Sequence, residues 1–82
     1  MYHIVYMTTN LINGKRYIGD HSTNNLNDNY LGSGLAINNA IKKYGSKNFC
    51  KQVLEEFNTK QEAFNAQERY IKEFDTLEPN GY

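Results

Sequence analysis

The sequence predicts an α+β domain in which a small three-stranded antiparallel sheet is flanked by helices. Two features indicate this class: aromatic and β-branched runs in three places, and helical repeats of apolar residues in two. A chain of 82 residues can hold one modest core, so residues 1–82 are expected to form a single domain.

The first element is a β-hairpin. Residues 2–7 and 16–19 have strand character, and Asn13-Gly14 between them forms a turn that tolerates positive φ. Because alternate side chains of a strand share a face, Tyr6 and Tyr17 are expected to meet on one face of the hairpin. Such a pair is commonly a cross-strand contact that contributes roughly 0.5 to 1 kcal/mol to stability. The pattern alone leaves a structural and a catalytic role open.

A loop and a helix follow. Residues 20–29 are rich in Asn, Asp, Ser and Thr, which favour irregular structure, and His21 lies in this predicted loop. A histidine there is either solvated or able to contact a phosphate or a water. Apolar residues at helical spacing then predict a helix with Ser33 as its N-cap and Gly45 at its end. The free backbone N–H groups at the predicted start of this helix, at Ser33, are a candidate phosphate site.

The third strand is predicted at 48–57, with Lys51 and Glu55 on the same face as Phe49 and Val53. The last helix opens with Thr59 and Glu62 at the spacing of a capping box. Its predicted apolar stripe consists of Ala63, Phe64, Tyr70, Ile71 and Phe74.

Two polar residues of the last helix lie on or beside that stripe. Steps of 100° per residue place Gln67 at its centre and Glu68 near its edge. A polar group in a buried face needs a partner, because leaving it unsatisfied costs roughly 1 to 3 kcal/mol.

Charge and composition constrain the partners. Nine basic and nine acidic residues cancel, so strong binding of DNA by this domain alone is not expected. The local basic cluster is either a solvated face or a weak phosphate contact, with a separate DNA-binding domain outside the chain supplying the main affinity. It consists of Lys42, Lys43, Lys47 and Lys51. The single cysteine and the absence of a long apolar run predict a soluble intracellular protein with no membrane association.

The tyrosine motifs carry a family resemblance. The tract 3–6, ending in Tyr6, and the tract Lys15-Arg16-Tyr17-Ile18-Gly19 resemble the paired motifs of the GIY-YIG nuclease superfamily. The likeness extends to Asn80-Gly81-Tyr82. It is greatest to phage-type and homing-endonuclease-like catalytic domains, in which a histidine and Tyr-Leu-Gly-Ser-Gly follow, here His21 and 30–34. It implies a DNA endonuclease of the cytoplasm of a bacterial or phage-infected cell.

The resemblance also implies roles for individual residues. The phosphodiester would be hydrolysed with one Mg²⁺ or Mn²⁺ ion, and Tyr6 would accept a proton from water, directly or through His21. Since a tyrosine has a pKa of about 10, a nearby cation or the metal would have to lower the pKa of Tyr6. Tyr17 and Lys15 would orient water and phosphate. The residues expected to contact DNA are Arg16, Ser33, Lys42, Lys43 and Lys47.

Three departures from the family pattern put this role in doubt. The acidic metal ligand four positions before Ile71 is matched by Gln67, whose neutral carbonyl suits Mg²⁺ poorly. Glu68 is the alternative ligand, but moving it inward is expected to pull Phe64 and Ile71 from their packing. Asn27 stands in the region of a family arginine. The closing Gly-Tyr-Asn stops at Tyr82, which suggests a longer protein.

Three functions therefore stay open from the sequence. The first is a nuclease, inactivated or not at Gln67. The second is a nucleic-acid-binding module that kept the fold and lost the chemistry. The third is a protein-interaction domain that uses some of its seven tyrosines.

Overall fold

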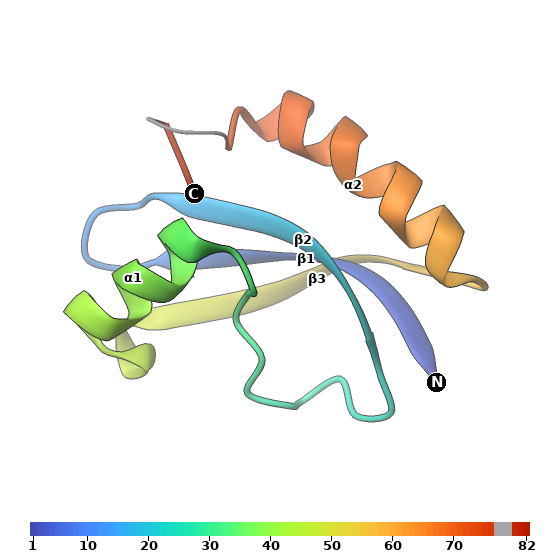
Figure 1. Ribbon diagram of the computed structural model, residues 1–82, viewed down its shortest axis with the longest axis horizontal. Coiled ribbons are helices and arrows are strands. Elements are labelled where there is room, and N and C mark those ends of the chain that lie inside the picture. Colours follow the sequence, from blue (N-terminus) through green and yellow to red (C-terminus); the bar gives the residue numbers. More distant parts are fainter. Residues whose placement is uncertain (77–79) are drawn as a thin grey trace.

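The computed structural model describes residues 1–76 and 80–82. The order of elements is β1 (Tyr2–Asn10), β2 (Arg16–Thr23), α1 (Leu35–Tyr44), the 3-10 helix η1 (Ser46–Asn48), β3 (Phe49–Phe57) and α2 (Lys60–Phe74). The strands form one antiparallel sheet in the order β2-β1-β3, so β1 is central. Helix α2 lies along one side of the sheet and α1 lies on the other (Figure 1). The predicted α+β class is confirmed.

The hairpin is longer than predicted. Strand β1 pairs with β2 from Tyr2↔Thr23 to Thr9↔Arg16, and the turn contains Gly14 at a φ of 78°. The loop predicted from Asp20 therefore begins only after Thr23. Asn, Asp and Ser favour local turns, but eight consecutive pairs with β1 supply the backbone hydrogen bonds that override this preference.

A β-bulge lies beside Tyr6. Val5 pairs with Glu55 while Tyr6 pairs with Val53, so β3 contains one extra residue at this point. The bulge changes which side chains share a face. Lys51 lies over the ring of Tyr6, whereas Glu55 accepts a hydrogen bond from Tyr70 of α2 at 2.7 Å. The prediction that Lys51 and Glu55 share a face is therefore wrong.

Each face of the sheet has its own small core. On the α2 side, Val5, Ile18 and Ala63 are buried. On the α1 side, Ile37, Ala40 and Phe49 are buried. Phe64 does not join the predicted stripe of α2, because 52% of it is exposed; Ala66 packs against the core instead.

The helix ends show one correct and one wrong prediction. Thr59 accepts a hydrogen bond from the backbone N–H of Glu62 at 3.2 Å, as the capping-box spacing predicted. Helix α1 has Gly34 as its N-cap, with no side-chain capping bond, so Ser33 is not the N-cap. The predicted stop at Gly45 is confirmed by its position as C-cap, with a φ of 88°. No helix within residues 1–76 and 80–82 is long and apolar enough to cross a membrane.

Candidate active site

Tyr6 lies at the centre of an aromatic cluster on the α1 side of the sheet. Its ring centroid is 6.2 Å from that of Tyr17, 6.3 Å from that of His21 and 5.9 Å from that of Tyr30. The expected meeting of Tyr6 and Tyr17 is confirmed. Gly19, opposite Tyr6 in the ladder, makes this packing possible: a methyl group there would lie 2.8 Å from the Tyr6 hydroxyl.

The environment of Tyr6 keeps its phenol neutral. The residue is 1% exposed. Burial, followed by the nearby phenols of Tyr17 and Tyr30, raises the pKa of Tyr6 far above its ordinary value. The ammonium of Lys51, 6.0 Å from the ring centroid, does not reverse this. Lys51 therefore does not act as the nearby cation expected to lower the pKa of Tyr6, and the neutral side chain is a hydrogen-bond donor.

His21 is fixed by neighbours that sequence reasoning missed. It lies on β2 rather than in a loop, and its ring stacks on Tyr30 at 3.9 Å between centroids. Its Nε2 is 2.9 Å from the Oδ2 of Asp28. The Nζ of Lys51 is 2.9 Å from the other carboxylate oxygen. The sequence signalled Asp28 only as one acidic residue in a polar segment.

The cluster opens at Tyr17 into a cleft of about 310 Å³ between the edge strand and α2. Gln67 and Glu68 both line this cleft, together with Tyr82. Glu68 thus reaches the cleft without any rotation of the helix. The packing argument against Glu68 is wrong for Phe64, which is largely exposed and also lines the cleft, whereas Ile71 packs against the core as expected.

Gln67 does not need a buried partner. It is half-buried, and in the described part of the chain no buried side-chain nitrogen or oxygen lacks a hydrogen bond. The predicted cost of an unsatisfied polar group in the core of α2 therefore does not arise.

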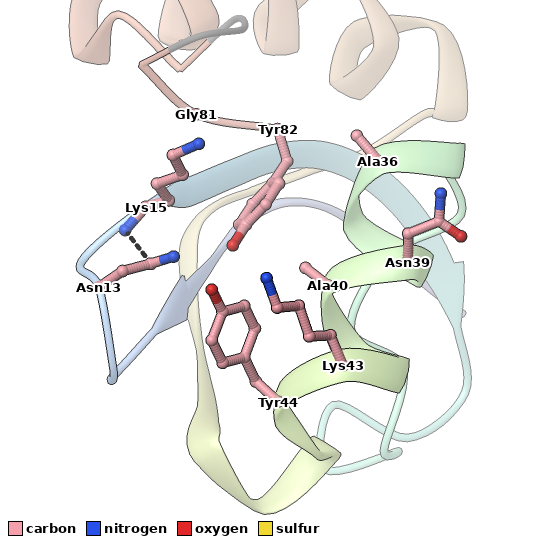
Figure 2. A pocket seen from close by; sticks show the side chains of 9 residues that line it. All are labelled: Asn13, Lys15, Ala36, Asn39, Ala40, Lys43, Tyr44, Gly81 and Tyr82. Atoms are coloured by element: carbon pink, nitrogen blue, oxygen red, sulfur yellow. Dashed lines mark hydrogen bonds between the residues drawn. The ribbon is translucent and has the colours of Figure 1, made fainter.

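A second cleft, of about 410 Å³, lies between the hairpin turn and α1 (Figure 2). Lys15 enters it from the hairpin, with its Nζ 5.9 Å from the ring of Tyr82. Lys43 enters it from α1, with its Nζ 5.3 Å from the ring of Tyr44. Lys15 is therefore placed beside Tyr82 rather than in the Tyr6 cluster. Two ammonium groups and two aromatic rings make this cleft suited to an anion that carries a flat ring.

Tyr82 separates the two clefts and is held by both of its polar groups. Its backbone N–H donates to the carbonyl of Arg16 at 2.9 Å. Its hydroxyl accepts from the side-chain amide of the fully buried Asn10 at 3.0 Å. The close approach at Gly81 allows this, since a methyl group there would collide with the carbonyl oxygens of Thr76 and Arg16.

The remaining predicted DNA contacts have varied surroundings. Arg16 donates to the carbonyl of Phe74 at the end of α2, at 3.0 Å, and stacks on its ring. This contact gives Arg16 a structural role, because it joins β2 to the end of α2. It also places Arg16 apart from the tyrosine cluster. Ser33, Lys42 and Lys47 are exposed. The ammonium of Lys51 is paired with the carboxylate of Asp28, so Lys51 does not add to the positive charge of the predicted basic cluster.

The cleft offers few ligands for a metal ion. No group of three or more His, Cys, Asp or Glu side chains within residues 1–76 and 80–82 is arranged to hold one. Among the side chains that line the cleft, Glu68 carries a carboxylate and Gln67 carries a neutral amide. Mg²⁺ commonly uses one or two carboxylates together with water and substrate phosphates. The residues therefore fit a cation that is shared with a bound phosphate.

Comparison with known families agrees with this geometry. The model of the GIY-YIG catalytic domain matches residues 2–82. The chain belongs to the GIY-YIG family. The resemblance predicted from the two tyrosine motifs is thus confirmed, and Tyr6, Tyr17 and Gly19 of this GIY-YIG domain are the motif residues that pack together.

Relatives of this GIY-YIG domain occur in Enterobacteria phage T4. The chain is 54% identical over 88 residues to segE, covering 99% of this chain and 43% of segE. It is 44% identical over 73 residues to segD, covering 89% and 33%. It is 53% identical over 53 residues to Endonuclease segA, covering 65% and 24%. The chain therefore spans less than half the length of these relatives. No solved structure matches it.

Proposed function

We propose that this GIY-YIG domain is the catalytic part of a DNA endonuclease that hydrolyses phosphodiester bonds with one divalent cation. The observation that carries the proposal is the position of Tyr17, which packs against the buried Tyr6 and also lines the cleft that contains Glu68. Tyr17 thus lies between the tyrosine cluster, which can transfer a proton, and the cleft with the carboxylate of Glu68. The endonuclease name of the relative segA supports the same reaction.

The roles of the residues follow from their surroundings. Neutral Tyr6 is a hydrogen-bond donor, and because it is 1% exposed it would act on the reacting phosphate through Tyr17, which would orient the phosphate at the mouth of the cleft. Glu68 would hold Mg²⁺ or Mn²⁺, with the carbonyl of Gln67 beside it. When bound, the cation stabilises charge on the phosphate and on the leaving oxygen.

The substrate strand would also contact the second cleft. Lys15 and Lys43 supply positive charge for a phosphate, and the rings of Tyr44 and Tyr82 supply stacking surface for a base. Since the formal net charge is zero, affinity for DNA is expected to be low. A separate DNA-binding region of the whole protein would supply the rest.

The first experiment is the nicking of supercoiled plasmid in Mg²⁺ or Mn²⁺. The wild-type chain is expected to nick, and Glu68→Gln and Tyr6→Phe are each expected to lose roughly 10²-fold or more of the rate. Glu73→Gln, which removes an exposed carboxylate elsewhere on α2, is the matched control and keeps the rate.

Two other outcomes contradict parts of this proposal. Nicking by Gln67→Glu alone means that position 67 holds the metal and that this chain is a disabled nuclease. No nicking by any variant, combined with retained DNA binding, favours the non-catalytic nucleic-acid-binding module. The neutral Gln67 at the cleft is the observation that favours this second function.

A further inference from the structure

The carboxylate of Asp28 collects four hydrogen bonds. Its Oδ1 accepts from Lys51 Nζ at 2.9 Å and from the backbone N–H of Tyr30 at 3.3 Å. Its Oδ2 accepts from Thr23 Oγ1 at 2.8 Å and is 2.9 Å from His21 Nε2. Lys51 also donates to the backbone carbonyl of Asp28, at 3.2 Å. Such a set fixes the carboxylate in position and direction, with one oxygen aimed at the imidazole.

We propose that Asp28 is a positioning residue that holds His21 as the Nε2–H tautomer, so that Nδ1 of His21 is the general base of the hydrolysis. The inference rests on the proposed endonuclease function and specifies how its site moves a proton.

The tautomer follows from the charge state of Asp28. The ammonium of Lys51, followed by the bonds from His21 and Thr23, holds the pKa of Asp28 well below its usual range. An ionised carboxylate only accepts hydrogen bonds, so the proton of this contact lies on Nε2. In the neutral imidazole the lone pair is then on Nδ1. Lys51 already neutralises the carboxylate, so His21 need not carry a charge to satisfy it.

The ring of His21 is also fixed in orientation. It stacks on Tyr30 with an interplanar angle of 6°, and the ring of Tyr6 meets it edge-on at 79°. The titratable groups around it are Tyr6 of β1, Lys51 of β3, and Asp28 and Tyr30 of the segment after β2. Its side chain remains 20% exposed, which leaves a path for a water molecule.

The proposed step is a balanced hydrolysis. The oxygen of a water molecule forms a bond to phosphorus, and the proton of that water goes to Nδ1 of His21. The bond between phosphorus and the leaving oxygen breaks with its electron pair, and the leaving oxygen takes a proton from solvent. This division of work agrees with Tyr6, whose raised pKa makes it a donor rather than a base.

The first test is direct and needs no cleavage. In ¹⁵N-labelled protein, the imidazole nitrogen shifts of His21 at neutral pH are expected to show the Nε2–H tautomer. In Asp28→Asn they are expected to show a mixture, because an amide can donate as well as accept. A wild-type ring with its proton on Nδ1 overturns the proposal.

The second test is the pH dependence of plasmid nicking. Asp28→Asn is expected to lower kcat at least ~10-fold with little change in KM, and His21→Ala to lower it ~10²- to 10⁴-fold. The loss in kcat is expected across the pH range of the assay, because an amide at position 28 can present either its oxygen or its N–H to Nε2 of His21. Glu73→Gln is the control: it removes an exposed carboxylate on α2, away from the Asp28 contacts, and keeps the wild-type profile.

The outcomes separate this inference from the proposed function. If the wild-type protein nicks DNA and Asp28→Asn, shown to be folded by circular dichroism, has the wild-type profile, the positioning role is refuted alone. If the folded wild-type protein does not nick DNA with either metal, the endonuclease function fails and the catalytic role of Asp28 fails with it.

Discussion

Replacement of Gly19 by alanine tests whether the two motif tyrosines depend on close packing against the strand. A methyl group at this position would lie 2.8 Å from Oη of Tyr6 and 3.0 Å from Cε2 of Tyr17. Since comfortable contacts between such atoms are about 3.5 Å, the phenol of Tyr6 must shift by roughly 0.7 Å. Tyr6 is 1% exposed, so its neighbours resist that shift.

The expected cost of Gly19→Ala is that of overpacking a core, about 1 to 3 kcal/mol. In a domain of this size each kcal/mol lowers Tm by roughly 4 to 8 °C, which thermal melting followed by circular dichroism measures readily. A misplaced reactive group costs on the order of 10²-fold in rate, so nicking should fall further than the folded fraction.

Gly34→Ala is the matched control for Gly19→Ala. Its methyl group would lie 3.5 Å from the ring of the same Tyr17, which is an ordinary contact, and its φ of −74° suits alanine. A change in stability of less than about 1 kcal/mol is expected. Equal Tm values and equal nicking rates for the two variants would refute the packing argument.

Three further predictions concern charged residues. Arg16→Met is expected to lower the free energy of unfolding in urea by about 1 to 2 kcal/mol, because the carbonyl of Phe74 loses its hydrogen-bond donor. The salt dependence of DNA binding is expected to stay constant. A smaller slope of log K against log salt would instead indicate that Arg16 contacts a phosphate. The pKa of Asp28 is lower in the folded state than in the unfolded state, where it is about 3.9, so the contribution of Asp28 to stability is present above that pH and is lost as the pH falls further. Below pH ~4 the free energy of unfolding of wild type, measured in urea, should therefore fall more steeply with decreasing pH than that of Asp28→Asn. Parallel curves for the two proteins would contradict this. Lys43→Ala should reduce the slope of log K against log salt by about 1, whereas Lys72→Ala on α2 should not, and equal slopes for the two would exclude the second cleft as a phosphate site.

Local signals were enough to predict most elements. The Asn13-Gly14 turn, the stop at Gly45 and the cap at Thr59 each depend on one or two residues, and all three are found as predicted. The meeting of Tyr6 and Tyr17 also depends only on strand alternation and a short turn.

The errors arise where long-range contacts decide. The polar residues of β2 pair with β1, which local propensity does not register. The bulge beside Tyr6 changes which side chains of β3 share a face, and no single residue of the sequence indicates the bulge. The site differs for the same reason: Lys51 and Asp28 are 23 positions apart in sequence, and only the pairing of β3 with β1 brings them together.

The first strand of the chain is also the central strand of the sheet, and this sets an order of assembly. The β1–β2 hairpin closes through a short turn, whereas the β1–β3 ladder, from Asn10↔Phe49 to His3↔Phe57, closes across β2, α1 and η1. Loop-closure entropy therefore favours the hairpin as the early structure. Tyr6 and Tyr17 would meet in this first kinetic phase, but Lys51 and Glu68 would join them only when β3 and α2 dock. Pulsed hydrogen exchange during refolding tests this order, which requires that β3 amides are protected no earlier than hairpin amides. The aromatic residues of the site would then come together first, and its charged residues would join them last.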